Sequence, residues 1–144
     1  MTVSAPESLV ADEWLYDTLS ANTTIAAAVG TRIYAELAPQ GAAFPCIVFS
    51  ALPSDDMMAV GAIRIWEDLE YNIRVIGQGE SLSELQEVAA AIDDVLHAKS
   101  GTTASGTGLT VACTRLRESR YAEVYDGVPY RHLGGIYHIL AQRA

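Results

Sequence analysis

The sequence predicts a single α+β domain, with a mostly antiparallel sheet of four to five strands and helices packed mainly on one face. Three observations support this. Stretches with apolar residues at helical spacing are interspersed with stretches that alternate as strands do. Their order is two helices, two strands, a helix and two strands. The length of 144 residues fits one domain over residues 1–144, in which residues 1–7 are expected to be a flexible N-terminus.

Two helices are expected at the N-terminal end. Residues 8–21 place apolar side chains on one face and several acids toward solvent. Asn22 has a side chain suited to capping a short helix over residues 25–29. Gly30 then ends that helix, because glycine readily takes the backbone conformation found after a helix terminus.

A third helix is predicted over residues 81–98. Ser81 and Glu84 have the spacing of a capping box, which satisfies backbone N–H groups at a helix start. The apolar residues that follow form one stripe at helical spacing. Such a stripe is typical of a helix that packs on a sheet.

Two strands are expected between these helices. Residues 44–52 have Pro45 near their start and contain a continuous apolar run, so we expect this strand to be covered on both faces. Residues 63–75 alternate between apolar and polar, and the one polar break, at Glu67, is a candidate position for a bulge or bend. This strand is more than twice the usual length of about 5–6 residues. It therefore either wraps a strongly bent sheet or projects to pair with something outside its own domain.

A hairpin is expected at the C-terminal end. Its first strand includes residues 109–117, and Tyr125-Asp126-Gly127-Val128 contains a sequence typical of two-residue hairpin turns. Residues 130–140 return as the last strand. A kink or bulge is expected at Gly134-Gly135, because glycine weakens a regular strand.

Two loops join these elements, residues 54–61 and residues 100–108. The second is rich in Gly, Ser and Thr, and it lacks the lysine and the spacing of a phosphate-binding loop. We therefore expect residues 100–108 to be a flexible linker.

The charge balance argues against one class of function. The formal net charge is -9 and the pI is about 4.6, so tight, non-specific binding to nucleic acid is not expected. The N-terminus has neither the basic patch nor the apolar run of a signal peptide, and no stretch approaches the roughly 20 apolar residues that span a membrane. The expectation is a soluble, intracellular protein with no membrane partner.

No pattern of residues predicts catalysis, a metal site or a cofactor. Cys46 and Cys113 lie in apolar runs and are expected to be buried free thiols, the wrong setting for a reactive thiolate. His132 and His138 point to the same face of one predicted strand but lie about 20 Å apart, too far to share one metal ion. We therefore predict no enzymatic activity, no metal and no cofactor.

Surfaces suited to protein contact are predicted instead. Trp66 lies among charged residues on the polar face of the long strand, which suits either the core of a protein interface or ordinary core under a covering helix or loop. Arginines and tyrosines, favoured at interfaces, gather toward the C-terminal hairpin, although an exposed hairpin with solvated charges has the same pattern. The candidate interface residues are Asp55, Asp56, Met57, Met58, Arg64, Trp66, Arg74, Arg115, Arg117, Arg120, Tyr125 and Arg131.

A short alanine-rich helix ending in Val29-Gly30-Thr31-Arg32-Ile33-Tyr34 is followed by Phe44-Pro45-Cys46-Ile47-Val48-Phe49. These stretches resemble the Val-Gly-x-Arg-Ile-Tyr signature, and the strand that follows it, in the tail terminator (tail completion) proteins of long-tailed bacteriophages. The order of elements is similar over nearly the whole chain. The residues that match the signature, and for which we expect a structural role, are Gly30, Arg32, Ile33, Tyr34 and Pro45.

The resemblance implies a non-enzymatic structural protein of the virion. Members of the family form a ring, commonly hexameric, that caps the finished tail tube, stops its polymerisation and presents a docking surface for the head and neck. The implied partners are further copies of the chain, the tail tube protein and a head–tail neck or connector protein. DNA would pass through the ring without specific binding. The implied location is the head-proximal end of the tail, after assembly in the host cytoplasm.

The resemblance also suggests roles for particular segments. Arg32 is expected to anchor the turn by pairing with an acid on the helix, and Tyr34 to pack under the sheet. Loops 54–61 and 100–108 are expected to face neighbouring subunits, the tube or the neck, since binding function often lies on loops. Two alternatives stay open: another neck or head-completion protein, and a cellular α+β module that binds a peptide or small ligand. A small hydrolase has no supporting set of residues.

Overall fold

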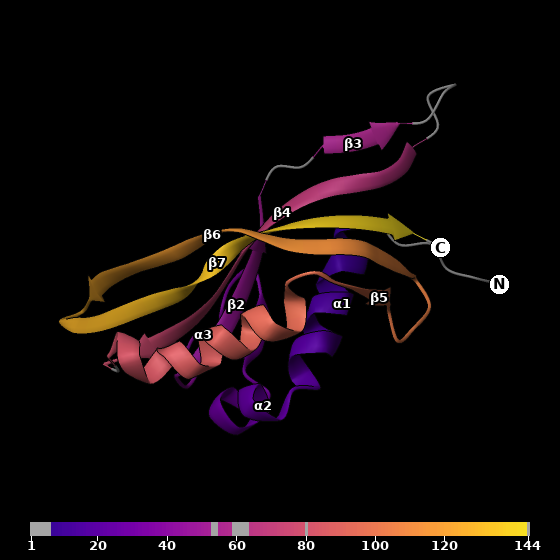
Figure 1. The fold of residues 1–144 in the computed structure, drawn as a ribbon. Helices are drawn as coiled ribbons and strands as arrows, with labels where there is room; N and C mark the ends of the chain where they lie inside the picture. Colours follow the sequence, from indigo (N-terminus) through magenta and orange to yellow (C-terminus); the bar gives the residue numbers. More distant parts are fainter. Residues whose placement is uncertain (1–6, 53–54, 59–63, 80, 144) are drawn as a thin grey trace.

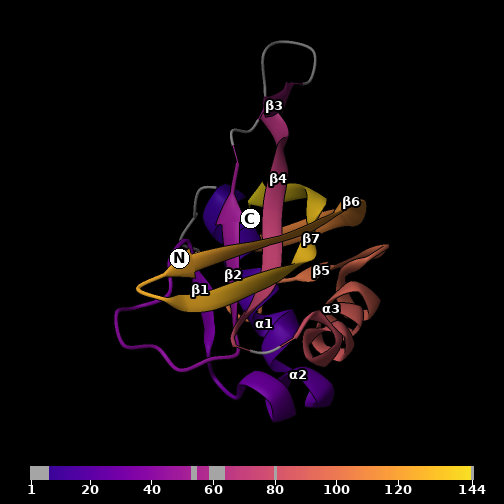
Figure 2. The same ribbon diagram turned by 90° about the vertical axis from the view of Figure 1, so that its left-hand side faces the viewer.

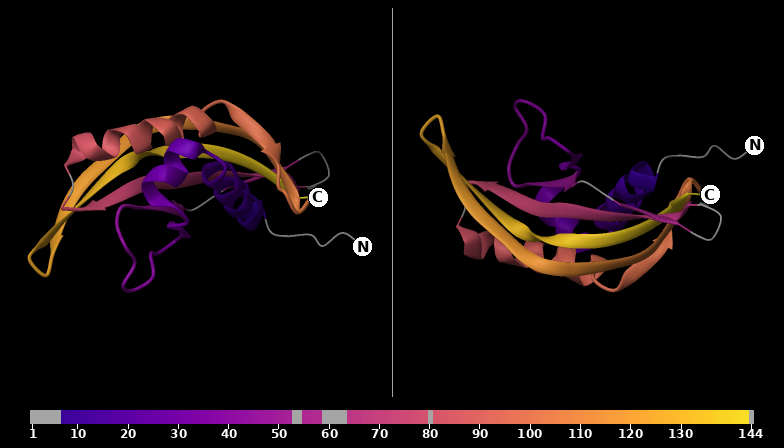
Figure 3. Two further views of the ribbon diagram at one scale, coloured as in Figure 1. Left: turned by 90° about the horizontal axis from the view of Figure 1, so that it is seen from below. Right: turned by 90° about the horizontal axis from the view of Figure 1, so that it is seen from above.

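The computed structural model describes residues 7–52, 55–58, 64–79 and 81–143. In these residues the chain forms three helices and one curved, mostly antiparallel sheet, with the helices on one face (Figures 1 and 3). The α+β prediction is confirmed, but the described part of the sheet has seven strands instead of four to five. The helices are α1 (Glu7–Ser20), α2 (Thr23–Val29) and α3 (Leu82–Leu96). The strands are β1 (Ile33–Ala35), β2 (Cys46–Ala51), β3 (Asp55–Met58), β4 (Arg64–Gln78), β5 (Lys99–Thr102), β6 (Gly108–Tyr125) and β7 (Val128–Arg143).

The strands follow the order β1-β2-β4-β7-β6-β5, and β3 pairs with β4 outside this path. β1 is parallel to β2, and all other pairs are antiparallel. β4 is therefore flanked on one side by β7 and on the other by β2 and then β3. The extra strands relative to the prediction are the short ones, β1, β3 and β5.

The helix ends agree with the sequence signals. The Asn22 side chain accepts a hydrogen bond from the Ile25 amide at 3.0 Å, and α2 ends at Gly30 with φ of 60°. The Ser81 side chain caps α3 by accepting from the Glu84 amide. α1 begins at Glu7, the last residue of the segment expected to be flexible, and residues 1–6 lie outside the described residues.

The two faces of the sheet bury different sets of residues. The large core lies between the sheet and the helices and includes Leu15, Tyr71 and Ile92. A smaller cluster lies on the opposite face, where Cys46, Val48 and Ile76 are buried with partly buried neighbours. Because β2 contributes to both clusters, its predicted coverage on both faces is confirmed.

The long strand is longer than predicted and has no bulge at Glu67. β4 has 15 residues and pairs with β7 without interruption from Glu67 to Gln78. The alternation of faces stays in phase across Glu67, so no extra residue is needed there. In the described part of β4, a register shift lies against β3, where Met57 pairs with Trp66 and Met58 with Arg64.

Both predicted loops contain strands, which corrects that part of the sequence interpretation. Asp55–Met58 is β3, and the rest of the 54–61 segment lies outside the described residues. β3 forms because β4 extends past the end of β2 and offers a backbone edge. Residues 99–102 form β5, which pairs with β6.

The rest of the second loop is not a free linker, because it is fastened to α1. The hydroxyls of Ser105 and Thr107 donate to the Glu13 carboxylate at 2.8 and 2.6 Å. These hydrogen bonds lower the pKa of Glu13, and the one from Thr107 has the largest effect. The Ala104 amide donates to Asp17 at 3.2 Å. Two helix acids thus order a segment whose composition alone predicts flexibility.

The C-terminal hairpin is confirmed, and its irregularity lies on the other strand. Asp126 and Gly127 have φ of 52° and 76°, as a two-residue turn of the primed type requires. β7 pairs regularly at Gly134, and the register shifts lie on β6. A Cβ at Gly134 would lie 2.0 Å from the carbonyl oxygen of Ile73, so glycine is needed there for the close approach of β7 to β4.

Candidate assembly surfaces

The signature turn is held by hydrogen bonds to the backbone. Arg32 donates from Nε to the carbonyl of Pro45 at 3.0 Å and from its terminal nitrogen to the carbonyl of Ala28 at 3.3 Å. It thereby ties the end of α2 to the start of β2. In the described residues these carbonyls, and not the expected acid, are its partners. Tyr34 is half-buried in the smaller cluster.

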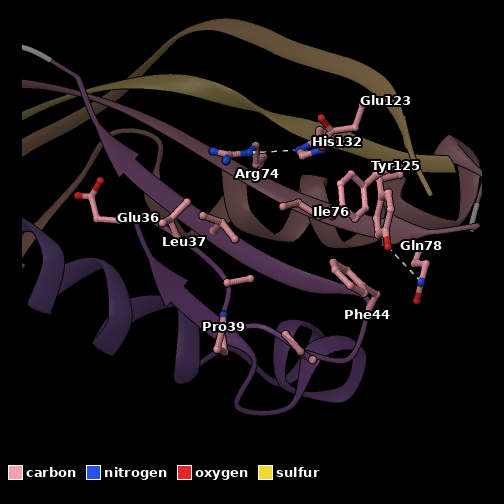
Figure 4. Close-up of a pocket in the computed structure, with 15 residues that line it drawn as sticks. Glu36, Leu37, Pro39, Phe44, Arg74, Ile76, Gln78, Glu123, Tyr125 and His132 are labelled. Atoms are coloured by element: carbon pink, nitrogen blue, oxygen red, sulfur yellow. Dashed lines mark hydrogen bonds and ion pairs between the residues drawn. The ribbon is translucent and has the colours of Figure 1, made fainter. Parts of the chain in front are cut away.

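The sheet face opposite the helices, here called the open face, has a groove of about 530 Å³ (Figure 4). The loop after β1 forms one wall, and β4, β6 and β7 form the other. Val48 and Ile76 contribute apolar floor, beside the edge-to-face pair of Phe44 and Tyr130 with ring centroids 5.3 Å apart. Leu37, which is 82% exposed, lies on the loop wall.

A chain of three polar side chains crosses the open face and lines part of this groove. Arg74 on β4 donates from Nε to Nδ1 of His132 on β7 at 3.2 Å (Figure 4). Nδ1 is therefore the acceptor, and Nε2 carries the proton that is donated to Glu123 on β6 at 2.8 Å. Tyr121 stacks on the imidazole at 4.1 Å. Burial lowers the pKa of His132, which agrees with a neutral ring.

The second histidine of β7 and the two cysteine thiols have surroundings of their own in the described residues. His138 contacts Asp68, so the two histidines of β7 have separate acidic partners. Burial raises the pKa of Cys46 to about 11 and that of Cys113 to about 12, and both are free buried thiols as predicted. Within the described residues, no three His, Cys, Asp or Glu side chains are grouped to hold a metal ion.

Buried tyrosines link the sheet to acids on the helices. The Tyr71 hydroxyl donates to Asp12 of α1 at 2.5 Å, and the Tyr137 hydroxyl donates to Asp93 of α3 at 3.1 Å. Burial raises the pKa of both tyrosines, and it also raises that of Asp12. Arg115 lies 3.9 Å from Asp93. These contacts hold α1 and α3 in place on the sheet.

The part of the hairpin over residues 114–131 is here called the β6–β7 arm. Its tip extends past the helices (Figures 1 and 3), whereas Arg115 at its base lies beside Asp93 of α3. β5 pairs with β6 only as far as Cys113, so β7 is the sole strand partner of residues 114–125 in the described structure. Arg117 and Arg120 are exposed and have no side-chain partner among the described residues. The exposed large apolar residues of the arm are Leu116 (46%), Tyr121 (43%), Val124 (73%) and Tyr125 (75%).

A second projection, here called the β3–β4 end, comprises residues 55–58 and 64–70. Figure 2 shows it leaving the body of the sheet in a different direction from the arm. β3 pairs with β4 along one edge, and the described residues place no strand on its other edge. Trp66 is half-buried here, and its Nε1 is buried without an acceptor among the described residues.

The structure divides the predicted interface residues among three places and does not gather them into one site. Arg74 lies on the open face, where it lines the groove together with Tyr125 of the arm. The β3–β4 end contains Asp55, Asp56, Met57, Met58, Arg64 and Trp66. The β6–β7 arm contains Arg115, Arg117, Arg120, Tyr125 and Arg131.

Comparison with known protein families identifies this architecture. Residues 13–131 match the family described as tail completion protein gp17. The chain belongs to this family. Its members are structural proteins that complete phage tails. The matched residues include both the signature turn and the arm.

The tail completion fold also has a counterpart among solved structures. A chain in the virion of a native gene transfer agent particle has 22% identity and a TM-score of 0.68. The match covers 92% of this chain and 97% of that one, so the two share their fold over almost the full length. No curated protein matches the sequence. No helix in the described residues of this tail completion protein is long and apolar enough to cross a membrane.

Sequence interpretation missed the polar chain on the open face of this tail completion protein. A signal for it was present, because a two-residue turn at Asp126-Gly127 fixes the register of the whole hairpin tip. Pairing of Tyr125 with Val128 places Tyr121 opposite His132 and Glu123 opposite Tyr130, as observed. The third partner, Arg74, depends on the pairing of β4 with β7, for which the sequence has no such signal.

Proposed function

We propose that the protein caps the finished tail tube as an oligomeric ring, six-membered as is common in tail terminators. The ring ends tube polymerisation and presents the docking surface for the head and neck. The observation that carries this proposal is membership of the tail completion family over residues 13–131. The proposal treats the chain of residues 1–144 as one domain and one subunit of the ring.

The shape of the subunit supports a ring. Head-to-tail contacts close into a ring only when one subunit has two different, complementary surfaces. The β6–β7 arm and the β3–β4 end are two such projections, and they leave the body in different directions (Figures 1 and 2). The signature turn does not project, which agrees with a structural role for it.

The charge of the chain supports a passive path for DNA. With a net charge of -9, a ring of these subunits repels phosphate, so DNA passes through it without specific binding. The other proposed partners are the tail tube protein on one side of the ring and the neck or connector protein on the other. The ring would sit at the head-proximal end of the tail in the virion, after assembly in the host cytoplasm.

The proposed role requires no chemistry from the chain. The thiols have raised pKa values, and each histidine of β7 contacts an acid of its own. Contact between proteins is the task for which the exposed arginines and aromatic residues are suited.

Electron microscopy of particles made without this protein tests the proposal. Overlong tails, or tails that have no heads attached, are the expected result. Particles with normal tails would contradict it. Light scattering on the purified chain, alone and with tube ends added, should detect a ring in at least one of the two preparations, whereas a monomer in both argues against the ring.

A further inference from the structure

We infer that neighbouring copies are joined by contact between the β6–β7 arm of one copy and the β3–β4 end of the next, an inference that rests on the proposed ring. The occupant of the arm surface is therefore a second copy of this chain. Three observations support this pairing in the described structure: an unpaired strand edge on each projection, opposite local charge, and two exposed arginines on the arm that have no side-chain partner among the described residues.

The first observation is the long free edge of β6. From Thr114 to Tyr125 this strand has β7 on one side and no strand on the other in the described structure. In the described residues its outward backbone groups pair with no other strand, and the Arg115 amide donates to Nδ1 of His97 at 3.1 Å. Such an edge is a template for strand addition, and exposed apolar side chains like Val124 and Tyr125 add area to bury. On β3 too, the described residues place no strand on the edge away from β4.

The second observation is that the two projections have opposite charge balances. The arm, residues 114–131, has four arginines against three acids, in a chain whose net charge is -9. The β3–β4 end has five acids, among them Asp55 and Asp56, against the single base Arg64. Copies of an acidic chain repel one another, so a contact between them forms where the basic segment of one copy meets an acidic segment of the next.

The third observation concerns which bases are free to make that contact. Arg32 donates to backbone carbonyls, Arg74 to His132, and Arg115 lies beside Asp93. Arg117 and Arg120 are exposed and have no side-chain partner among the described residues. Because they lie on one projection and the acids on another, a copy-to-copy contact is head-to-tail, the type that closes rings.

A charge exchange between two variants tests the pairing. The double variants R117E/R120E and D55R/D56R should each form rings with at least about tenfold weaker association than wild type, because like charges then face one another. An equal mixture of the two variants should recover rings, since an alternating arrangement restores an opposite-charge contact at every interface. Light scattering and electron microscopy measure this in whichever preparation, with or without tube ends, gives wild-type rings.

Two controls separate the contact from folding and from total charge. K99E reverses one charge, which is half the change made by R117E/R120E, at an exposed residue of β5 outside both projections, and it should assemble as wild type does. R117K/R120K keeps the charge and should retain most of the assembly. Melting temperatures confirm that each variant is folded, and the arm variant alone decides the matter if D55R/D56R fails to fold.

The outcomes distinguish this inference from the proposed function. If R117E/R120E forms rings as readily as wild type does, the pairing of the two projections is wrong and the ring proposal stands. The pairing is also wrong if R117E/R120E forms rings but no longer binds tube ends. In that case the arm contacts the tube protein. If both variants lose rings and their mixture does not recover them, the two projections are not partners. Absence of wild-type rings in both preparations overturns the ring and the pairing together.

Discussion

Arg32 in the signature turn and Arg120 on the β6–β7 arm are the same residue type in opposite settings. Arg32 is half-buried and donates to the carbonyls of Pro45 and Ala28. Arg120 is exposed and has no side-chain partner in the described structure. The first arrangement holds a helix end to a strand, whereas the second leaves a donor available to another molecule.

The difference shows why the most recognisable motif is not the best candidate for the assembly surface. A turn that must be closed by specific internal hydrogen bonds restricts its residues and leaves a short signature. A contact surface on a strand edge uses exposed charge and aromatic area, which many sequences supply. The following predictions test this contrast between the body of the fold and the arm, from the largest expected effect to the smallest.

The largest effect is expected from Gly134→Ala. The new Cβ would lie 2.0 Å from the Ile73 carbonyl oxygen and 2.6 Å from the Arg74 Cα, and backbone atoms of a central strand have no room to move. We expect the free energy of unfolding to fall by about 3 kcal/mol or more, measured by urea denaturation. Ser119→Ala, directly opposite Gly134 on β6, is the control and should cost less than about 1 kcal/mol. Equal stability of G134A and wild type would show that β4 and β7 are not so closely apposed.

The next effect is expected from Arg32→Ala. This change removes two hydrogen bonds from a charged donor, so we expect the free energy of unfolding to fall by about 2 kcal/mol. Arg32→Lys keeps a single point donor and should recover part of that loss. If R32A left the melting temperature unchanged and yet abolished ring formation, the structural role of Arg32 would be wrong.

The parts of the fold that could be predicted from sequence depend on neighbours in the chain. Asn22 and Ser81 cap helices that begin within the next residues, and Asp126-Gly127 sets a turn of two residues. β3 depends instead on how far β4 extends past β2. The turn after β5 depends on Glu13, which lies 94 positions before Thr107, and composition alone gives the opposite expectation of a flexible linker.

The residue types of the candidate surfaces could be predicted from the sequence, but their positions in the fold could not. The sequence shows Arg117 and Arg120 in a predicted strand, yet it does not show that β5 ends its pairing at Cys113 and leaves their edge free. Trp66 was compatible with an interface or with core, and it lies half-buried, between those two alternatives. Their roles in assembly stay predictions.

The polar chain that connects the arm to the body predicts a pH dependence. Since burial lowers the pKa of His132, the unfolded chain takes up a proton at a higher pH than the folded one. Stability should therefore fall as the pH is lowered from above about 6.5, the usual pKa of histidine, and the loss should be complete below the folded pKa. Denaturation of wild type and His132→Gln across this range measures the contribution as the difference between the two. Identical pH dependence in both proteins would show that protonation of His132 does not contribute to the change in stability.

The smallest effect on stability is expected from Arg120→Ala, the counterpart of Arg32→Ala. Because the Arg120 side chain is exposed and has no partner in the described residues, its removal should change the free energy of unfolding by less than about 0.5 kcal/mol. Its effect should appear only in association, measured by light scattering at equal protein concentration. The two alanine variants thus separate folding from assembly with one residue type. A loss of stability in R120A as large as that in R32A would mean that the arm is part of the folded body and not a surface held ready for another copy.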